Sequence, residues 1–166
     1  MKFAHSLLGF GFAALLAAPV SASDTLNKNM VERGRYIIAT SGCNDCHTPG
    51  YAQKDGNVPE SEWLTGERMG WQGPWGTTYA ANLRHSLSPL TEQQWLARAR
   101  GEFRPPMPGF NLRAMTDADL KAIYHYVKSL PLKGDPVPAY VPPGRQVATP
   151  YFDFTPKNLP KQTAAR

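Results

Sequence analysis

Cys43-Asn44-Asp45-Cys46-His47 is the stretch that decides the fold of this chain. Two cysteines three positions apart, followed directly by a histidine, form the attachment motif of a c-type haem. Each thiol can add across one vinyl group of the porphyrin, and His47 then turns under the iron as its proximal axial ligand. The motif therefore predicts one haem c per chain, held covalently through Cys43 and Cys46.

Two other uses of a cysteine pair fit this sequence less well. A structural zinc ion takes four ligands, usually two such pairs or one pair with two spaced histidines, and the chain has only 2 cysteines. A thioredoxin-like redox pair is expected after a strand, whereas a helical pattern precedes Cys43. Haem attachment is therefore the favoured interpretation.

The first residues have the pattern of a secretory signal peptide. Lys2 supplies the positive charge, residues 7–18 the apolar segment, and residues 20–22 (Val-Ser-Ala) the small-residue cleavage site. We expect cleavage after Ala22. The apolar segment is too short to cross a bilayer, which needs about 20 residues. The prediction is an exported protein of a bacterial periplasm, without a transmembrane anchor after cleavage.

Charge limits the class of partner. The chain has 18 Lys and Arg against 13 Asp and Glu, a formal net charge of +5, and loss of Lys2 leaves +4 (17 − 13). The basic residues are scattered along the sequence, which gives no support to nucleic-acid binding. A basic rim could steer docking to an acidic redox partner. A charge of this size is equally ordinary for a soluble protein.

Apolar residues at helical spacing predict a helix over residues 29–40 that leads into the haem motif. Gly34 interrupts its pattern at a cost of about 1 kcal/mol relative to alanine, which indicates a closely crossing helix. A second helix is expected from Thr91 to Gly101. A third begins at Thr116, with Asp119 in a capping-box position, and ends before Pro131.

No alternating apolar run marks a core strand, so we expect an all-α fold with long loops. Residues 49–82 are rich in glycine and proline and carry four large aromatic residues, Trp63, Trp71, Trp75 and Tyr79. Loops of this length need something large to pack on, and the porphyrin can supply that surface.

We divide the chain into a signal peptide (1–22), a haem domain (23–130) and a Pro-rich C-terminal extension (131–166). Both cysteines are committed to the haem, so no disulfide is expected. The prolines favour extended, polyproline-like backbone in the extension. Four aromatic residues argue against pure disorder there: Tyr140, Tyr151, Phe152 and Phe154. They could attach the extension to the haem domain or to a partner, and the sequence leaves both open.

The second axial ligand has six candidates: Met30, Met69, Met107, Met115, His85 and His125. Met107 is favoured because it lies in Pro105-Pro106-Met107-Pro108-Gly109, where three prolines restrict the backbone around one thioether. Met30 and Met69 are better explained as packing residues. Met115 directly precedes the helix cap Thr116 and can pack on Leu120, so it is the first substitute.

Histidine ligation is the competing possibility, because imidazole also binds haem iron. His125 lies within the last predicted helix, where a partly solvated surface histidine is the ordinary explanation. His85 lacks a restraining sequence context but stays open as a ligand. The sequence prediction is coordination by His47 and Met107.

These features resemble the class I monohaem cytochrome c family, with the haem motif near the start, a distal Met107-Pro108 and a final amphipathic helix. The resemblance covers residues 31–130. It is closest to the cytochrome c subunits and domains of periplasmic dehydrogenases, through residues 75–83 (WGTTYAANL) and 119–124 (DLKAIY). It implies the cytochrome c fold and haem contacts from residues 75–83.

The resemblance also implies that Gly34 crosses an aromatic residue of the last helix, either Tyr126 or Tyr124. The chain departs from the family pattern after Leu83, where Arg84-His85-Ser86 replaces a threonine-proline turn. We expect Trp75, Tyr79 and Arg84 as haem contacts, because their N–H and O–H groups suit the haem propionates. The two aromatic residues could instead simply line the pocket.

Two protein ligands on the iron leave no vacant position for a substrate, so we expect a carrier of single electrons rather than an enzyme. A periplasmic dehydrogenase as donor, and a cytochrome or oxidase as acceptor, are implied by family analogy alone. One alternative is a haem subunit fixed in a larger dehydrogenase complex through the extension. The other is a haem enzyme or gas sensor, for which Met107 offers no distal acid or base.

Overall fold

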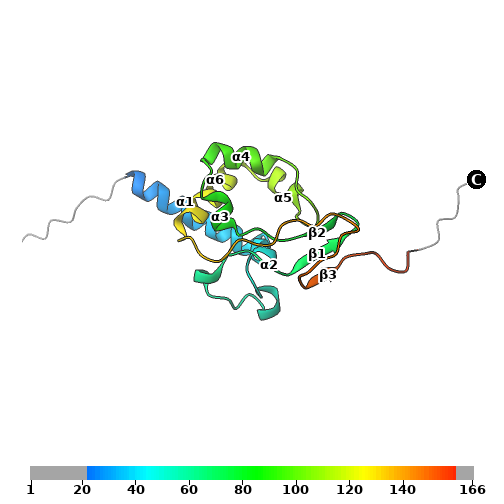
Figure 1. The fold of residues 1–166 in the computed structure, drawn as a ribbon. Helices are drawn as coiled ribbons and strands as arrows, with labels where there is room; N and C mark the ends of the chain where they lie inside the picture. Colours follow the sequence, from blue (N-terminus) through cyan, green and yellow to red (C-terminus); the bar gives the residue numbers. More distant parts are fainter. Residues whose placement is uncertain (1–21, 160–166) are drawn as a thin grey trace, which may run out of the picture.

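The computed structural model describes residues 22–159, in which six α-helices accompany a small three-stranded sheet (Figure 1). The helices are α1 (Ala22–Thr40), α2 (Cys43–His47), α3 (Leu83–Leu87), α4 (Glu92–Arg100), α5 (Gly109–Ala114) and α6 (Asp117–Ser129). Short 3-10 turns, η1 (Ala52–Lys54) and η2 (Glu60–Glu62), lie between α2 and the sheet. The predicted all-α class is confirmed, although α1 starts earlier than residue 29.

Helix ends follow the capping residues of the sequence. Thr91 precedes α4 and exchanges two hydrogen bonds with Gln94: Gln94 N donates to Thr91 Oγ1 (3.2 Å), and Thr91 N donates to Gln94 Oε1 (2.9 Å). Gly101 ends this helix. Thr116 caps α6 by accepting a hydrogen bond from Asp119 N (3.1 Å). These caps satisfy amide groups that have no partner inside their helices.

The crossing of α1 and α6 forms the centre of the core. An ideal Cβ built on Gly34 would lie 2.7 Å from Tyr126 Cβ and closer still to the carbonyl oxygen of Ala122. Tyr126, not Tyr124, is therefore the aromatic residue at the crossing. Its hydroxyl donates to Glu60 Oε1 (2.8 Å), and burial raises the pKa of this phenol well above its ordinary value.

Residues 70–78, expected to be loop, contain a short hairpin. Strand β1 (Gly70–Gly73) pairs antiparallel with β2 (Gly76–Thr78), with Trp71 opposite Thr78. Gly76 has a φ of +95°, which glycine adopts without strain at this turn. Strands of three or four residues are too short to produce an alternating apolar pattern, which is why the sequence did not indicate them.

The C-terminal extension lies along the haem domain over most of its described length (Figure 1). Strand β3 (Tyr151–Asp153) pairs parallel with β1, so the sheet order is β2-β1-β3. Thr77 and Val141 exchange two backbone hydrogen bonds, of 2.8 and 3.0 Å. Between the two alternatives left open by the sequence, these contacts attach residues 141–153 to the chain's own domain.

Two further predictions concern the signal peptide and the absence of a transmembrane anchor. Of the predicted signal peptide, residues 1–22, residues 1–21 lie outside the described residues. Within residues 22–159, every helix is too short or too polar to cross a membrane.

Candidate functional site

A cavity of about 540 Å³ opens among α2, α4, α5 and the sheet. Cys43, Cys46 and His47 line one part of it, and mostly apolar residues of other elements line the rest. Cavities of this size and polarity are typical of cofactor sites. The sequence motif and this mostly apolar hollow therefore coincide.

The motif is presented to the cavity by α2. Gly42, with a φ of +72°, turns the chain between α1 and α2. Thr48 then fixes the end of α2: its hydroxyl donates to Asn44 Oδ1 (2.7 Å) and accepts from Leu64 N (2.8 Å). These buried bonds hold the histidine turn against the segment that follows, so the position of His47 is set by its neighbours.

The two cysteines are free thiols that face the cavity. Burial raises the pKa of Cys43 to about 11, so its thiol keeps its proton at neutral pH. Burial also raises the pKa of Cys46. A protonated thiol carries both the sulfur and the hydrogen that are added across a vinyl group. Both thiols therefore suit thioether formation with a porphyrin placed in this cavity.

His47 is held in one tautomer. Its ring is buried, with 8% of the residue exposed, and Nδ1 lies 2.7 Å from Ala81 O. A carbonyl oxygen only accepts, so Nδ1 must carry the proton and Nε2 keeps its lone pair. Burial lowers the pKa of this imidazole, which favours the neutral form. A neutral ring with a free Nε2 is the form that binds iron.

Of the six candidates for the second axial ligand, only Met107 and Met115 line the cavity. The two histidines are bound elsewhere: His85 Nε2 lies 2.9 Å from Gly134 O, and His125 Nε2 lies 2.9 Å from Glu92 Oε2. Met30 and Met69 are also absent from the cavity wall. Among the six candidates, the cavity wall thus holds two methionines, one on either side of α5.

Hydrogen bonds restrain the proline-rich loop around Met107. Met107 N donates to Arg104 O (3.2 Å), and Gly109 N donates to Met107 O (2.9 Å). The hydroxyl of Thr78, at the end of β2, donates to Pro105 O (2.8 Å). The loop is therefore tied both to itself and to the hairpin.

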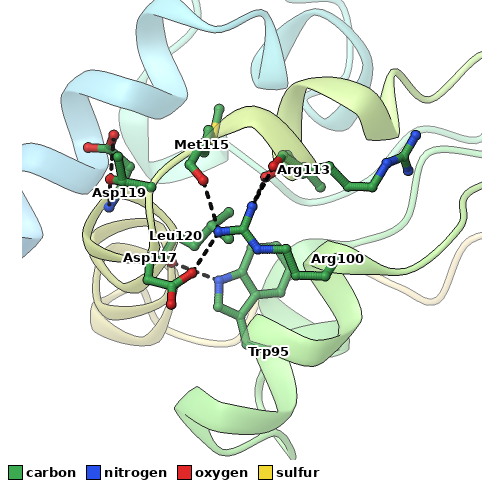
Figure 2. A network of polar contacts seen from close by, with 9 residues as sticks. Trp95, Arg100, Arg113, Met115, Asp117, Asp119 and Leu120 are labelled. Carbon is green, nitrogen blue, oxygen red and sulfur yellow. Dashed lines mark hydrogen bonds and ion pairs between the residues drawn. The ribbon is translucent and has the colours of Figure 1, made fainter.

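Arg100, at the end of α4, binds the far end of α5 (Figure 2). Its Nη1 donates to the carbonyls of Leu112 (3.0 Å) and Arg113 (2.7 Å), and its Nη2 donates to Met115 O (2.9 Å) and Asp117 Oδ1 (2.6 Å). Arg113 in turn donates to Gly101 O (3.2 Å). We call this pair of contacts the arginine clamp. It closes the base of the loop that carries Met107.

The three residues expected as haem contacts lie in different places. Tyr79 lines the cavity, and its hydroxyl lies 2.6 Å from Thr149 Oγ1. Trp75 is not among the lining residues, and its ring lies near Phe154, with centroids 6.4 Å apart.

Arg84 lies away from the cavity wall, contrary to expectation. The residue is 2% exposed, and its guanidinium donates to four backbone carbonyls: Glu60, Ser61, Trp63 and Pro131. A buried guanidinium needs partners for its donors, and the carbonyls of the surrounding loops provide them. Arg84 thus joins the loop at η2 to the start of the extension.

Sequence reasoning placed Trp71 in the segment expected to pack on the porphyrin, but it missed other lining residues: Arg98, Arg104, Pro138 and Tyr140. Arg104 could have been found, because it is the cation beside the Pro-Pro-Met sequence. Pro138 and Tyr140 could not, because nothing local indicates that the extension returns to the cavity. Tyr140 OH donates to Trp75 O (2.8 Å), which holds this part of the extension in place.

These features define a site for a covalently attached haem. Two thiols, a neutral imidazole with a free nitrogen and an apolar hollow are the groups that a haem c requires, so the residues present fit it. The zinc alternative has no support, because residues 22–159 contain no cluster of three or more His, Cys, Asp or Glu side chains placed to hold a metal ion.

The family model for cytochrome c matches residues 31–131, more than half of the chain, and the chain belongs to this family. The haem c and a role in electron transfer follow from that membership, and redox proteins are the general class of partner. No match was found among curated proteins or among solved structures.

Proposed function

We propose that this protein is a monohaem cytochrome c of the bacterial periplasm that carries single electrons between redox proteins, with His47 and Met107 as axial ligands. The observation that supports it most is the cavity itself. One hollow is lined both by the haem motif (Cys43, Cys46 and His47) and by Met107, although the motif and the proline-rich loop of Met107 are far apart in the sequence.

Each residue has a defined task in this proposal. The haem supplies a reversible one-electron couple. Ala81 O orients the His47 ring through Nδ1 and leaves Nε2 for the metal. Met107 would bind the iron through a neutral thioether, which favours a relatively high reduction potential. With both positions filled by protein, no site remains for a substrate, and the role is electron transfer.

Met107 is a better ligand than Met115 because the two residues are held differently. Met115 N donates to Asn111 O and Leu112 O, and Met115 O accepts from Arg100. This methionine also packs against the hydrophobic core. Its backbone is part of the junction between α5 and α6. Met107 packs against the core as well, but it lies in the proline-rich loop ahead of α5 and outside this junction.

The location and the partners rest on the sequence. Residues 1–22 have the pattern of an export signal, and covalent haem attachment in this family takes place outside the cytoplasm. By analogy with the family, the electron donor is a periplasmic dehydrogenase and the acceptor is another cytochrome or an oxidase. The Met/His ligation fits an acceptor of comparatively high potential.

A redox titration with a carbon monoxide exposure tests the carrier function. The purified holoprotein should titrate as a single one-electron couple, and the reduced form should bind carbon monoxide slowly or not at all, because both axial positions are taken. Rapid carbon monoxide binding at neutral pH, with a five-coordinate spectrum, would contradict the proposal and favour an enzyme or gas sensor.

A further inference from the structure

The C-terminal extension supplies part of the wall of the haem cavity. Its residues Pro138 and Tyr140 line the cavity together with residues of α2, α4, α5 and the hairpin. The family model for cytochrome c matches residues 31–131, so this part of the wall lies beyond the matched segment. Its contribution to the site is therefore a feature of this chain and does not follow from the family match.

Tyr140 is fixed against the hairpin of β1 and β2. Its hydroxyl donates to Trp75 O (2.8 Å), and the next residue, Val141, exchanges two backbone hydrogen bonds with Thr77 (2.8 and 3.0 Å). Gly76 lies against the ring: an ideal Cβ on this residue would stand 3.0 Å from Tyr140 Cε2 and closer still to Val141 O. No side chain fits between the hairpin and the extension here, so the ring has a defined position.

The ring of Tyr140 also contacts the loop that carries Met107. The guanidinium carbon Cζ of Arg104 lies over the ring, 4.2 Å from its centroid, which is a cation–π contact. Arg104 directly precedes Pro105-Pro106-Met107, and its carbonyl oxygen accepts the hydrogen bond from Met107 N (3.2 Å). Tyr140 thus holds the residue whose carbonyl closes the turn at Met107.

The Met107 loop depends on contacts from other segments. Of residues 104–108, three are prolines, which have no N–H group to donate. On its C-terminal side the loop continues into α5 and the arginine clamp. On its N-terminal side it is held by the Thr78 hydroxyl on Pro105 O (2.8 Å) and by the Tyr140 ring on Arg104. The extension therefore supplies one of the external contacts that restrain this loop.

We propose that Tyr140 is a positioning residue for the Met107 loop: its ring holds Arg104, and through Arg104 it holds the turn that presents the Met107 sulfur to the cavity. The proposal rests on the proposed ligation by Met107. In this role the extension serves the iron site without supplying a ligand, because it fixes the loop from the side of the hairpin.

Detachment of Met107 is the step that this contact should oppose. An external ligand such as imidazole binds the ferric iron only while the methionine is displaced, so its apparent rate of binding follows the fraction of molecules in which the loop has moved away. A contact that exists only in the closed loop lowers this fraction. Loss of one cation–π contact at a partly exposed position should raise it about fivefold.

Stopped-flow binding of imidazole to the ferric holoprotein tests the proposal. Tyr140→Leu keeps a large apolar side chain in the cavity wall but removes the ring, and it should bind imidazole about fivefold faster than the wild type. Tyr140→Phe keeps the ring over Arg104 and should stay close to the wild type. The matched control is Tyr151→Leu, because Tyr151 is a tyrosine of the same extension, 43% exposed, that does not line the cavity.

A second substitution tests whether Tyr140 acts through Arg104. Arg104→Gln removes the cation from the other side of the contact and should speed imidazole binding by a similar factor. The double variant Arg104→Gln/Tyr140→Leu should be no faster than the faster of the two single variants, because both substitutions remove the same contact. Two independent structural losses would instead multiply their factors. If Tyr140→Leu yields no holoprotein, Arg104→Gln decides, and a rate equal to that of Tyr151→Leu overturns the proposal.

Two results would overturn the role of Tyr140 while leaving the ligation by Met107 intact, in a wild type that shows the near-infrared band of a methionine bound to ferric iron. One is an equal rate for Tyr140→Leu and Tyr151→Leu, and the other is multiplied factors in the double variant. A wild type without that band, or a band that survives in Met107→Ala, would overturn the ligation itself.

Discussion

Gly34 in α1 and Tyr126 in α6 lie so close that no side chain fits between them. An ideal Cβ on Gly34 would stand 2.7 Å from Tyr126 Cβ, and the nearby carbonyl of Ala122 blocks the remaining space. Two helices can approach to this distance only where one of them lacks a side chain. The same crossing carries an outer ion pair between Arg33 and Asp119, 2.9 Å apart.

Gly34→Ala should therefore destabilise the protein even though alanine favours helix. The blocking atoms include backbone, so the helices must separate, and we expect a loss of about 2 kcal/mol in the free energy of unfolding. Urea unfolding followed by circular dichroism measures it. Asn29→Ala, at an exposed position of the same helix, is the control and should change little. Equal stability of the two variants would show that the crossing is not tight.

Arg100→Ala should weaken the arginine clamp and release the Met107 loop. The variant leaves the carbonyls of Leu112, Arg113 and Met115 without their donor, and we expect about 2 kcal/mol of destabilisation. The ferric form should also lose part of its Met-iron charge-transfer band in the near infrared. Arg100→Lys should restore little, because one ammonium group cannot reach all four acceptors. A full band in Arg100→Ala would mean that the clamp does not position Met107.

Asp119 should make the free energy of unfolding depend on pH in the acidic range. The hydrogen bond from Arg33 holds the pKa of this carboxylate below its ordinary value of 3.8, and the Thr116 hydroxyl adds to the effect. The unfolded chain therefore takes up a proton first as the pH falls, so this stabilisation is present above pH 3.8 and is lost as the pH falls through the folded-state pKa.

Unfolding of the wild type and of Asp119→Asn would be compared at neutral pH and near pH 3. At neutral pH the wild type should be more stable than Asp119→Asn, and the difference between their free energies of unfolding should become smaller near pH 3. Asp55→Asn is the control, because Asp55 is exposed and has no ion pair within residues 22–159. A gap that stays constant with pH would contradict the role of the Arg33–Asp119 pair.

A chain that ends at Pro131 should lose stability and expose its haem. It lacks Pro138 and Tyr140 from the cavity wall, the backbone pairing of Val141 with Thr77, and strand β3. Thermal unfolding would measure the loss of stability. Perturbation of the haem absorption spectrum by solvent additives would measure the exposure of the haem. A chain that ends at Leu159 keeps all of these contacts and is the matched control. If the shorter chain matched it in both measurements, the extension would serve a partner instead.

The helices that the sequence predicted share one property: each has a strong local signal. Thr91 with Gln94, and Thr116 with Asp119, cap α4 and α6 where the sequence places them. Gly34 likewise indicates a helix crossing from the sequence alone, and the crossing is present. Capping and close approach are encoded within a few residues, so a single sequence is enough to predict them.

The missed features depend on contacts between distant segments. Helix α5 has six residues, and its end is fixed by Arg100 from α4 rather than by its own sequence. Strand β3 exists because β1 offers it an edge. Arg84 looked like a propionate donor, but four carbonyls from two segments, residues 60–63 and Pro131, surround it instead. The sequence alone predicted the covalent motif and His47 as a ligand, while the residues that surround them in space could be found only from the fold.

The near-infrared charge-transfer band of the ferric holoprotein tests the central assignment most directly, because the band reports a methionine bound to the iron. Met107→Ala should abolish it, and Met115→Ala, which removes the other cavity methionine, should retain it. A band that survives in Met107→Ala and disappears in Met115→Ala would contradict the proposed ligation by His47 and Met107.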